Sequence, residues 1–398
     1  MFQRKKNYIY IFYFILLISL FFLAHNFSIK KDSNKANIKF IKTSFIDLPG
    51  WDNDFNEEVK IAFINSCNEI KKKTHDIKIF SFENYELFCE NLNVIENKKS
   101  LQLAIEKYFD PYFIKAQNQE AKFTGYVEII IKGRKNKNLV FAPSSVPILA
   151  KPKSIVSINL KDFNQNYEEV ILKGIIDNDK IRPLPTRKEI ETQNLFKENI
   201  LAYIDDPAQA FFLHVQGSGR LLLPDGQTMY VGYAENNGRP YTSIGKELIN
   251  RGEILKEDIS MQSIQAWMKN NLNKAQSLRH LNERYIFFEE RKTEEVIGAS
   301  KASLTPMFST AVDNKYYPFH LPFWVEVDSF AKEKGEKALL RTLFLAQDSG
   351  GAIKGPLRFD LFLGHGEKEE KIAGSLNSKG RAWVLIPKTN KKNKNYFN

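Results

Sequence analysis

The sequence predicts a fold that is mainly β with some α, and three observations support this. From Phe123 onwards, short apolar stretches are broken by turn residues, as in Tyr126–Ile131 and Ser154–Ile158. The C-terminal quarter of the chain repeats this pattern. By contrast, Asp54–Asn91 places its apolar residues near helical spacing. Helices are therefore expected near the N-terminus, and mostly strands from residue 123.

Local signals place the remaining elements. Further helices are predicted at Leu101–Phe109, Glu189–Asn199, Ile244–Asn250 with Gly252 as its stop, and Ser260–Asn270 with Ser260 as its cap. Further strands are predicted at Leu139–Phe141, Ala210–Gly217, Phe323–Val327, Leu339–Ala346, Phe359–Leu363 and Ala382–Ile386. Pro224-Asp225-Gly226 predicts a hairpin between Leu221–Leu223 and Met229–Tyr233. Residues 25–45 have the composition of a linker, Glu289–Ser300 that of a boundary, and Lys388–Asn398 that of a frayed tail.

Composition excludes several classes of protein. The 398 residues suffice for two or three domains, and 43% hydrophobic with 26% charged residues is ordinary globular usage. Disorder throughout and a multi-span membrane protein are therefore excluded. The net charge of +11 fits an anionic partner such as nucleic acid, anionic lipid or an acidic polymer, without choosing among them. The basic residues are not interleaved with aromatics as in RNA-binding signatures, so nucleic acid is not expected.

The N-terminus has the pattern of an export signal. Arg4, Lys5 and Lys6 precede the uncharged apolar run Tyr8–Ala24. The run is near the lower length limit of a membrane span, so an uncleaved anchor and a signal peptide both remain open. Either predicts that the bulk of the chain is exported.

Most common catalytic and metal motifs are absent. The six histidines form no metal-ligand pair, Ser218 is not in a nucleophile elbow, and no Walker loop or dinucleotide fingerprint is present. The two cysteines, Cys67 and Cys89, cannot form a four-ligand zinc site, and they are either a disulfide or two buried thiols. No metal and no organic cofactor is expected.

The strongest local signal is Leu345–Gly364, in which a glycine-rich loop joins two strands. Asp348 ends the first strand, Lys354 lies in the loop, and Asp360 lies on the second strand. Such a loop lets the backbone approach a ligand between two carboxylates. The alternative is that Asp348 caps the loop and Asp360 is an ordinary strand residue.

A second cluster combines Gln216–Arg220 with Gly232–Ser243. It offers amides, hydroxyls and aromatic rings in loops, which suits a sugar, because rings stack on sugar faces while amides bind hydroxyls. The alternative is a surface loop rich in glycine, asparagine and proline.

In this order, these stretches resemble the membrane-bound lytic murein transglycosylase A family. The resemblance rests on FTGYVE (123–128), RPLPTRKEIE (182–191), the segment 214–254, SMQSIQAWM (260–268), AVD (311–313), the segment 346–366 and GRAWVLIP (380–387). It implies a double-psi β-barrel built from residues 30–127 and 296–398, after a signal or anchor at 1–29. Residues 128–295 would form an inserted β-rich domain, and a groove for glycan would lie between the two. The C-terminal part resembles the three-aspartate domain, with Asp313, Asp348 and Asp360 as its acids.

The resemblance also implies an activity, that of a peptidoglycan lytic exotransglycosylase. Such an enzyme cleaves the β-1,4 bond between N-acetylmuramic acid and N-acetylglucosamine without water, and leaves a 1,6-anhydro end. Because the nucleophile is the substrate's own 6-hydroxyl, one carboxyl can act first as acid and then as base. This role falls to Asp360. Asp348 lies close by across the loop, where it could raise the pKa of Asp360 as an anion or hold it by a hydrogen bond. The alternative is that Asp348 itself is the acid.

Residue by residue, the match places further side chains in the groove. Thr124, Gly125, Tyr126, Gln216, Ser218, Tyr241 and Ser243 would bind substrate, with Asp313 and Lys354 in support. The partners implied are peptidoglycan strands, and the membrane through the N-terminal segment. The location implied is the periplasm, facing the cell wall. The alternatives are a hydrolase with Asp348 as base, a non-catalytic wall-binding module and a basic membrane-associated structural protein.

Three features depart from the family pattern. FTGYVEI lacks a second tyrosine and a proline, the Asp348–Asp360 loop is one residue longer at Pro356-Leu357, and no lipoprotein cysteine follows the apolar run. The first two affect substrate contacts, and the third affects only the anchor.

Overall fold

A computed structural model describes residues 38–53, 57–72, 83–116, 119–135, 145–167, 170–331 and 337–388. The apolar run Tyr8–Ala24, the predicted strand Leu139–Phe141 and the tail beyond Lys388 lie outside these ranges. None of the helices in the described ranges has the length and apolarity needed to cross a membrane.

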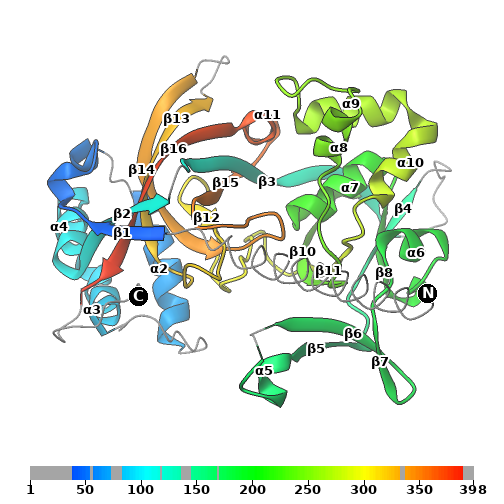
Figure 1. Ribbon diagram of the computed structural model, residues 1–398, viewed down its shortest axis with the longest axis horizontal. Coiled ribbons are helices and arrows are strands. Elements are labelled where there is room, and N and C mark those ends of the chain that lie inside the picture. The colour runs from blue at the N-terminus through cyan, green and yellow to red at the C-terminus, as the bar shows by residue number, and fades with distance from the viewer. Residues whose placement is uncertain are drawn as a thin grey trace, which may run out of the picture.

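Helices near the N-terminus cover one side of the main sheet (Figure 1). They are α2 (Glu57–Lys71), α3 (Glu83–Asn91) and α4 (Lys98–Tyr108), and a disulfide between Cys67 and Cys89 joins the first two. Their apolar faces pack with Trp324, Leu343 and Trp383 of the sheet in one buried cluster. The helices predicted near the N-terminus are therefore confirmed in the described residues. Of the two readings of the cysteines, the disulfide is the one that the structure has.

Thirteen of the described strands form one large sheet, with the order β1-β2-β16-β13-β14-β12-β15-β3-β9-β10-β11 along its main path. Its strands near the chain ends are β1 (Ile38–Lys42), β2 (Phe109–Ala116), β3 (Ala121–Arg134), β12 (Ser309–Ala311), β13 (Pro322–Ala331), β14 (Lys337–Asp348), β15 (Arg358–His365) and β16 (Asn377–Pro387). The helix α11 (Glu367–Ser375) packs against β3 and β15. Segments far apart in sequence are thus neighbours throughout this sheet.

The strand β3 links the two halves of the molecule (Figure 1). Its first residues pair with β15 in parallel and with β16 in antiparallel, and Ile129–Lys132 pair with β9. The second half contains β4 (Val146–Leu149), β8 (Ile200–Ile204), β9 (Gly219–Leu222), β10 (Thr228–Asn236) and β11 (Ile286–Arg291), with α6 (Arg187–Thr192), α7 (Pro207–Gln216), α8 (Ile244–Asn250), α9 (Met261–Asn270) and α10 (Leu272–His280). The strand β3 therefore begins in the first half and continues into the second.

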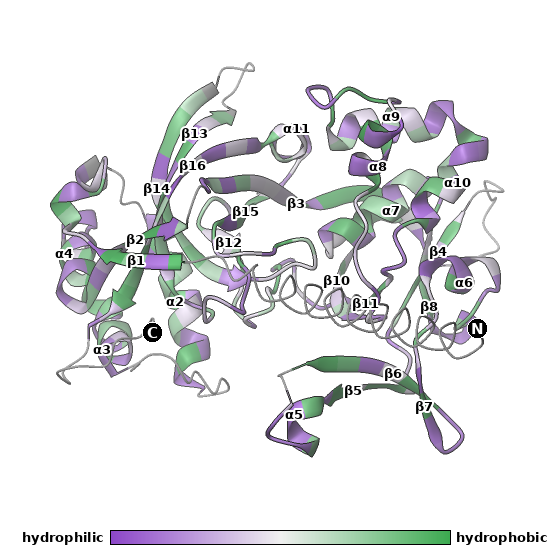
Figure 2. Cartoon of the chain, viewed as in Figure 1, coloured by the Kyte–Doolittle hydropathy of each residue, from purple (hydrophilic) through white to green (hydrophobic). Residues whose placement is uncertain are grey.

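A small separate sheet extends from the second half. It consists of β5 (Ile155–Asn159), β6 (Ile171–Asp177) and β7 (Lys180–Pro183), with the short helix α5 (Leu160–Phe163). The strand β6 is mainly hydrophobic (Figure 2). Its outward residues Leu172 and Ile176 are about half exposed, at 49% and 53%.

The prediction of a strand at Ala210–Gly217 is wrong, because these residues belong to the helix α7 and its end. Asp206 caps α7 by accepting hydrogen bonds from Ala208 N and Gln209 N, Pro207 occupies the first turn, and Gly217 ends it with φ of 83°. The residues from Ala210 to His214 are all buried. A helix buried on nearly all sides has no polar face to reveal its period.

Three smaller predictions also need correction. The linker prediction fails at Ile38–Lys42, which pairs with β2 while Ile38 and Phe40 pack on the core. The helix Glu189–Asn199 ends at Thr192, before Asn194 and Phe196 adopt positive φ. The boundary Glu289–Ser300 begins inside β11. The hairpin and the other predicted strands within the described ranges are confirmed.

Candidate active site

Four neighbouring strands place two carboxyl groups in one row across the sheet. Asp348 on β14 and Asp360 on β15 both pair with Ala311 on β12, from opposite sides. Thr124 on β3 pairs with Asp360 on its other side. The row therefore runs Asp348, Ala311, Asp360, Thr124, although its members span most of the chain.

Asp360 is held by its neighbours on β3 and β15. The hydroxyl of Thr124 donates to Oδ1 of Asp360, and Nη2 of Arg358 donates to the same hydroxyl oxygen at 2.6 Å. Burial raises the pKa of Asp360, while the charge of Arg358 and the Thr124 hydrogen bond act in the opposite direction. The carboxyl thus keeps a proton to higher pH than an exposed aspartate does.

Asp348 accepts three hydrogen bonds. Its Oδ1 accepts from the backbone N–H groups of Ala299 and Ser349, each at 2.9 Å, and its Oδ2 accepts from the hydroxyl of Tyr126 at 2.8 Å. Burial raises the pKa of Asp348, and these three donors oppose the rise. Because they stabilise a charged carboxylate, Asp348 is better suited than Asp360 to remain an anion.

Asp313 fixes the loop between the two acids. Its Oδ2 accepts from Gly355 N at 2.8 Å and its Oδ1 from Lys315 N at 3.2 Å. The hydroxyl of Tyr317 adds a hydrogen bond to Pro356 O at 2.6 Å. Lys354, predicted to support the site, has an exposed side chain on this loop.

Tyr126 and Tyr241 bring aromatic hydroxyls to the acids. Burial and the charges of Asp348 and Asp360 raise the pKa of Tyr126 well above its usual value. Burial and the charge of Asp360 also raise the pKa of Tyr241, against a hydrogen bond with Ser243. Ser243 in turn caps α8 by accepting from Lys246 N at 3.2 Å.

The other predicted residues make their contacts elsewhere. Gly125 lies against α11, since a Cβ there would meet Leu363 Cδ1 at 3.0 Å and Ala373 Cα at 3.1 Å. Gln216 ends α7 and accepts a hydrogen bond from Val127 N at 3.0 Å, which ties α7 to β3. Ser218 is buried at the start of β9. These positions support the frame around the acids.

Sequence reasoning missed two contributors, Arg358 and the backbone N–H of Ala299. Arg358 stands two residues before Asp360 on one strand, so the two share a strand face, and this spacing was the available signal. No local signal marks Ala299, because its contact with Asp348 arises only in the folded chain.

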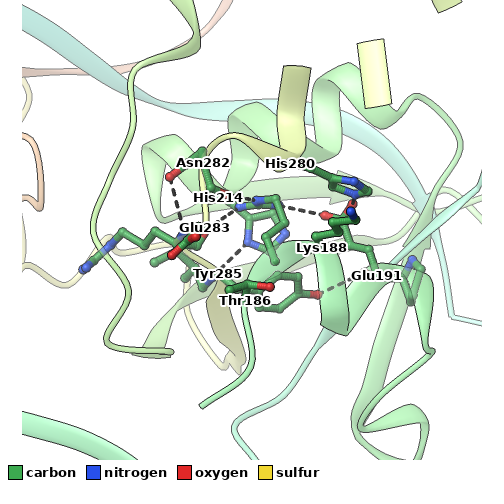
Figure 3. Close-up of polar contacts among 12 residues, drawn as sticks. Thr186, Lys188, Glu191, His214, His280, Asn282, Glu283 and Tyr285 are labelled. Atoms are coloured by element: carbon green, nitrogen blue, oxygen red, sulfur yellow. Dashed lines mark hydrogen bonds and ion pairs between the residues drawn. The ribbon is translucent and has the colours of Figure 1, made fainter. Parts of the chain in front are cut away.

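A buried polar network in the second half holds the loop that carries Tyr241. Asn237 Nδ2 donates to Pro185 O at 2.8 Å and to Glu283 O at 2.9 Å, and Asn282 Oδ1 accepts from Thr242 N at 3.1 Å. Figure 3 shows Asn282 and Glu283 beside the cluster of His214, Glu191 and His280. The loop is therefore fastened on both sides of Tyr241.

Arg187 lies at the centre of this network. Its side chain is 1% exposed and donates to Asn282 O, Arg284 O and Glu191 at 3.2, 2.8 and 2.9 Å. Nδ1 of His214 accepts from Ile286 N at 3.1 Å, and burial holds the pKa of His214 well below its usual value. His214 is thus a neutral core residue of α7.

Within the described ranges, no group of three or more histidine, cysteine or acidic side chains is arranged to hold a metal ion.

Comparisons with known proteins agree with this arrangement. A family model described as the MltA specific insert domain matches residues 122–289, and a 3D domain model matches residues 308–386. A membrane-bound lytic murein transglycosylase A homolog of Buchnera aphidicola is 32% identical over 96% of this chain and 97% of its own length. The Escherichia coli K12 membrane-bound lytic murein transglycosylase A is 39% identical over 51% of this chain and 56% of its own length.

Solved structures show the same likeness. The membrane-bound lytic murein transglycosylase of Agrobacterium tumefaciens matches with a TM-score of 0.77 and 26% identity, over 88% of this chain and 98% of that one. MltA of Escherichia coli with bound chitohexaose matches with a TM-score of 0.63 and 26% identity, over 89% and 97%. From these matches and the order of its motifs, the chain belongs to the membrane-bound lytic murein transglycosylase A family.

Proposed function

We propose that this protein is a lytic transglycosylase that cleaves the β-1,4 bond between N-acetylmuramic acid and N-acetylglucosamine in peptidoglycan and leaves a 1,6-anhydromuramic end. The observation that carries the proposal is the row Asp348, Ala311, Asp360, Thr124 in a chain of this family. Burial raises the pKa of both acids in that row. Asp360 has one hydroxyl donor and is able to hold a proton, and Asp348 accepts three hydrogen bonds.

Asp360 performs both proton transfers in this proposal. Protonated Asp360 gives its proton to the glycosidic oxygen as the bond from that oxygen to the muramyl C1 breaks. The muramyl 6-hydroxyl then forms the new bond to C1, and its proton passes to the Asp360 carboxylate. The acid is regenerated and no water is consumed. Because the nucleophile belongs to the same sugar, no second carboxylate is needed to activate it.

Asp348 serves as a fixed negative charge near the reacting sugar. Its three hydrogen-bond donors favour the ionised form, which argues against Asp348 as the acid. Since Ala311 lies between the two aspartates in the sheet, their Cα atoms are about 10 Å apart, or two strand spacings. That separation disfavours a proton shared between them. An anion at this distance stabilises positive charge developing at C1.

We further propose that residues 30–127 and 296–398 form a double-psi β-barrel, with residues 128–295 inserted as a second domain. Interleaving of strands from both chain ends supports the first part, as in the pairs β2–β16 and β3–β15. The influence of Asp360 on the pKa of Tyr241 supports a glycan groove between the domains, because Tyr241 belongs to the insert. Thr124, Tyr126, Tyr241 and Ser243 would line this groove.

The place of action proposed is the periplasm, with the N-terminal segment as membrane anchor or signal peptide. The apolar run Tyr8–Ala24 supports export, and the disulfide Cys67–Cys89 fits an oxidising compartment. The relatives' names describe them as membrane-bound. Glycan strands of the wall are the proposed substrate, and the Escherichia coli relative was solved with bound chitohexaose.

The test is to incubate the purified full chain with peptidoglycan sacculi, beside Asp360→Asn. Mass spectrometry of the released muropeptides should find 1,6-anhydro ends, lighter than reducing ends by one water, and none with the variant. Reducing ends would make the protein a hydrolase with Asp348 as base. Anhydro ends that persist in Asp360→Asn would move the acid to Asp348. Binding without any product would indicate a wall-binding module.

A further inference from the structure

A row of basic residues lies directly beside the row of acids. Arg358 on β15, Lys122 on β3 and Lys379 on β16 are paired across the three strands. Two positions further along the same strands, Asp360 pairs with Thr124, and Thr124 with Asn377. Residues two apart on a strand share a face and lie about 7 Å apart, so these cations face the same side of the sheet as Asp360.

Within the described residues, Lys379 is the member of this row that forms an ion pair. Lys379 forms an ion pair with Glu120 at 2.5 Å and is also close to Asp328. Arg358 donates to Thr124 Oγ1 and to Phe359 O, which are uncharged oxygens, at 2.6 and 2.8 Å. The acid whose negative charge acts on Arg358 is Asp360.

Lys122 lies among cations without an acidic partner. Burial and the charges of Arg358 and Lys256 lower its pKa. Within the described ranges, neither Lys122 nor Lys256 forms an ion pair, and both side chains are exposed. Lys122, Arg358 and Lys256 are here called the basic cluster, in which the charges of the other two act on Lys122 beside the proposed acid. Such a local excess of positive charge attracts anions.

The substrate supplies an anion at a suitable place. The sugar rings of a peptidoglycan strand are neutral, and its carboxylates belong to the lactyl ether on C3 of the muramyl residue or to the peptide attached there. The C3 substituent is on the same ring as the C1 atom that reacts beside Asp360. Chitohexaose carries no such substituent and no charge.

We propose that the basic cluster is a subsite for a carboxylate borne by the C3 lactyl substituent of the muramyl residue bound at Asp360. This inference rests on the proposed function and extends it to substrate selection. The carboxylate comes either from the lactyl group of a strand without peptide or from the stem peptide. Lysine and arginine recognise a carboxylate in either case through charge-assisted hydrogen bonds.

The test compares three ligands on the full chain and on the double variant Lys122→Gln/Lys256→Gln. They are peptide-bearing strands, strands with the peptide removed, and chitohexaose. The matched control is Lys115→Gln, which replaces an exposed lysine on β2 of the same sheet. The measurements are kcat/KM for the two muramyl substrates and Kd for all three ligands.

The double variant should lose about tenfold in kcat/KM on a carboxylate-bearing substrate, because charge-assisted contacts are lost. Chitohexaose binding and the control should stay within about twofold. A loss confined to peptide-bearing strands assigns the carboxylate to the peptide. A loss confined to strands without peptide assigns it to the lactyl group, whose carboxyl is an uncharged amide when the peptide is attached. A loss on both muramyl substrates means that either carboxylate occupies the subsite. Equal losses on all three ligands, or no loss on any, would overturn the subsite. If wild type releases no anhydro ends, the proposed function fails, and the Kd comparison still decides the subsite.

Discussion

Asp348 and Asp360 are each paired with Ala311, one from β14 and the other from β15. This relationship separates the two carboxyl groups by one intervening strand and gives each its own donors. Asp348 has three donors, whereas Asp360 has one hydroxyl and a nearby guanidinium. The three donors at Asp348 oppose the rise of its pKa that burial causes, and the charge of Arg358 and the Thr124 hydrogen bond do so at Asp360. Such differences in surroundings allow paired acids to take separate roles.

Replacement of Arg358 should change the pH dependence of the reaction. The first step proposed above needs protonated Asp360, so kcat/KM should fall as the pH rises through the pKa of that carboxyl. Arg358 lowers this pKa. In Arg358→Gln the pKa of Asp360 should therefore rise, and the alkaline limb of the kcat/KM profile should move to higher pH.

The control is Arg358→Lys, which keeps the charge and should leave the alkaline limb near its wild-type position. A limb that stays in place in Arg358→Gln, or moves to lower pH, would show that Asp360 is not the group that must be protonated.

Removal of the Tyr126 hydroxyl should weaken catalysis without abolishing it. In Tyr126→Phe, Asp348 loses one donor and keeps the N–H groups of Ala299 and Ser349. One charge-assisted hydrogen bond corresponds to about a tenfold loss in kcat. Binding of chitohexaose should persist, as measured by calorimetry. Complete inactivity would instead mean that this hydroxyl itself moves a proton.

The acids could be found in the sequence because a local motif marks them. Asp348, Asp360 and the loop between them lie within one short segment, and Asp313 stands in a second motif. The contact of Thr124 with Asp360 could be inferred only through the family resemblance, since β3 and β15 are 236 residues apart at that point. The contact between Ala299 and Asp348 had no signal of either kind.

The errors in the fold have a common cause. The helix α7 was missed because burial on nearly all sides removed its polar face, although Asp206-Pro207 marked its start. The strand β1 was missed because its lysines resemble a linker, while pairing with β2 is a tertiary event. In both cases packing outweighed local composition.

Removal of the Asp313 side chain should loosen the loop between the acids. The carboxylate is 5% exposed and accepts from Gly355 N and Lys315 N. In Asp313→Ala two N–H groups lose their acceptor, which costs about 1–3 kcal/mol each if they stay buried. We expect a lower Tm together with a lower kcat, measured by thermal unfolding and by muropeptide release.

The matched variant is Asp313→Asn, which retains one acceptor oxygen and should fall between wild type and Asp313→Ala. A Tm in Asp313→Ala equal to that of wild type would mean that the loop keeps its shape without this carboxylate.

Loss of the disulfide should destabilise the helical layer and leave the chemistry intact. Cys67 and Cys89 close a loop with a sequence separation of 22 residues. The chain-entropy model gives about 3 kcal/mol for a loop of this size. The variant Cys67→Ala/Cys89→Ala should therefore have a lower Tm in oxidising buffer, and its Tm should not respond to a reductant.

Wild type is the control, since its Tm should fall on addition of the reductant. The kcat of the variant at low temperature should match that of wild type, because the disulfide joins α2 and α3 and the acids lie on β14 and β15. Equal Tm values with and without the disulfide would contradict a stabilising role.

Glu191 should make the free energy of unfolding depend on pH in the acidic range. Burial alone would raise the pKa of this carboxyl, but the His280 hydrogen bond and the charge of Arg187 lower it from 4.5 to about 2. A group whose pKa is lower in the folded state stabilises that state above its unfolded pKa. The contribution is therefore present above pH 4.5 and is lost as the pH falls towards 2, and it amounts to about 3 kcal/mol.

Glu191→Gln should consequently lower the free energy of unfolding at pH 7 by more than it does at pH 3. Denaturant unfolding at several pH values measures this difference. Arg187 would remain buried without its anion in the variant, so the loss at neutral pH should be at least as large as the titration predicts. A loss that is the same at pH 3 and pH 7 would assign the role of Glu191 to packing instead of charge.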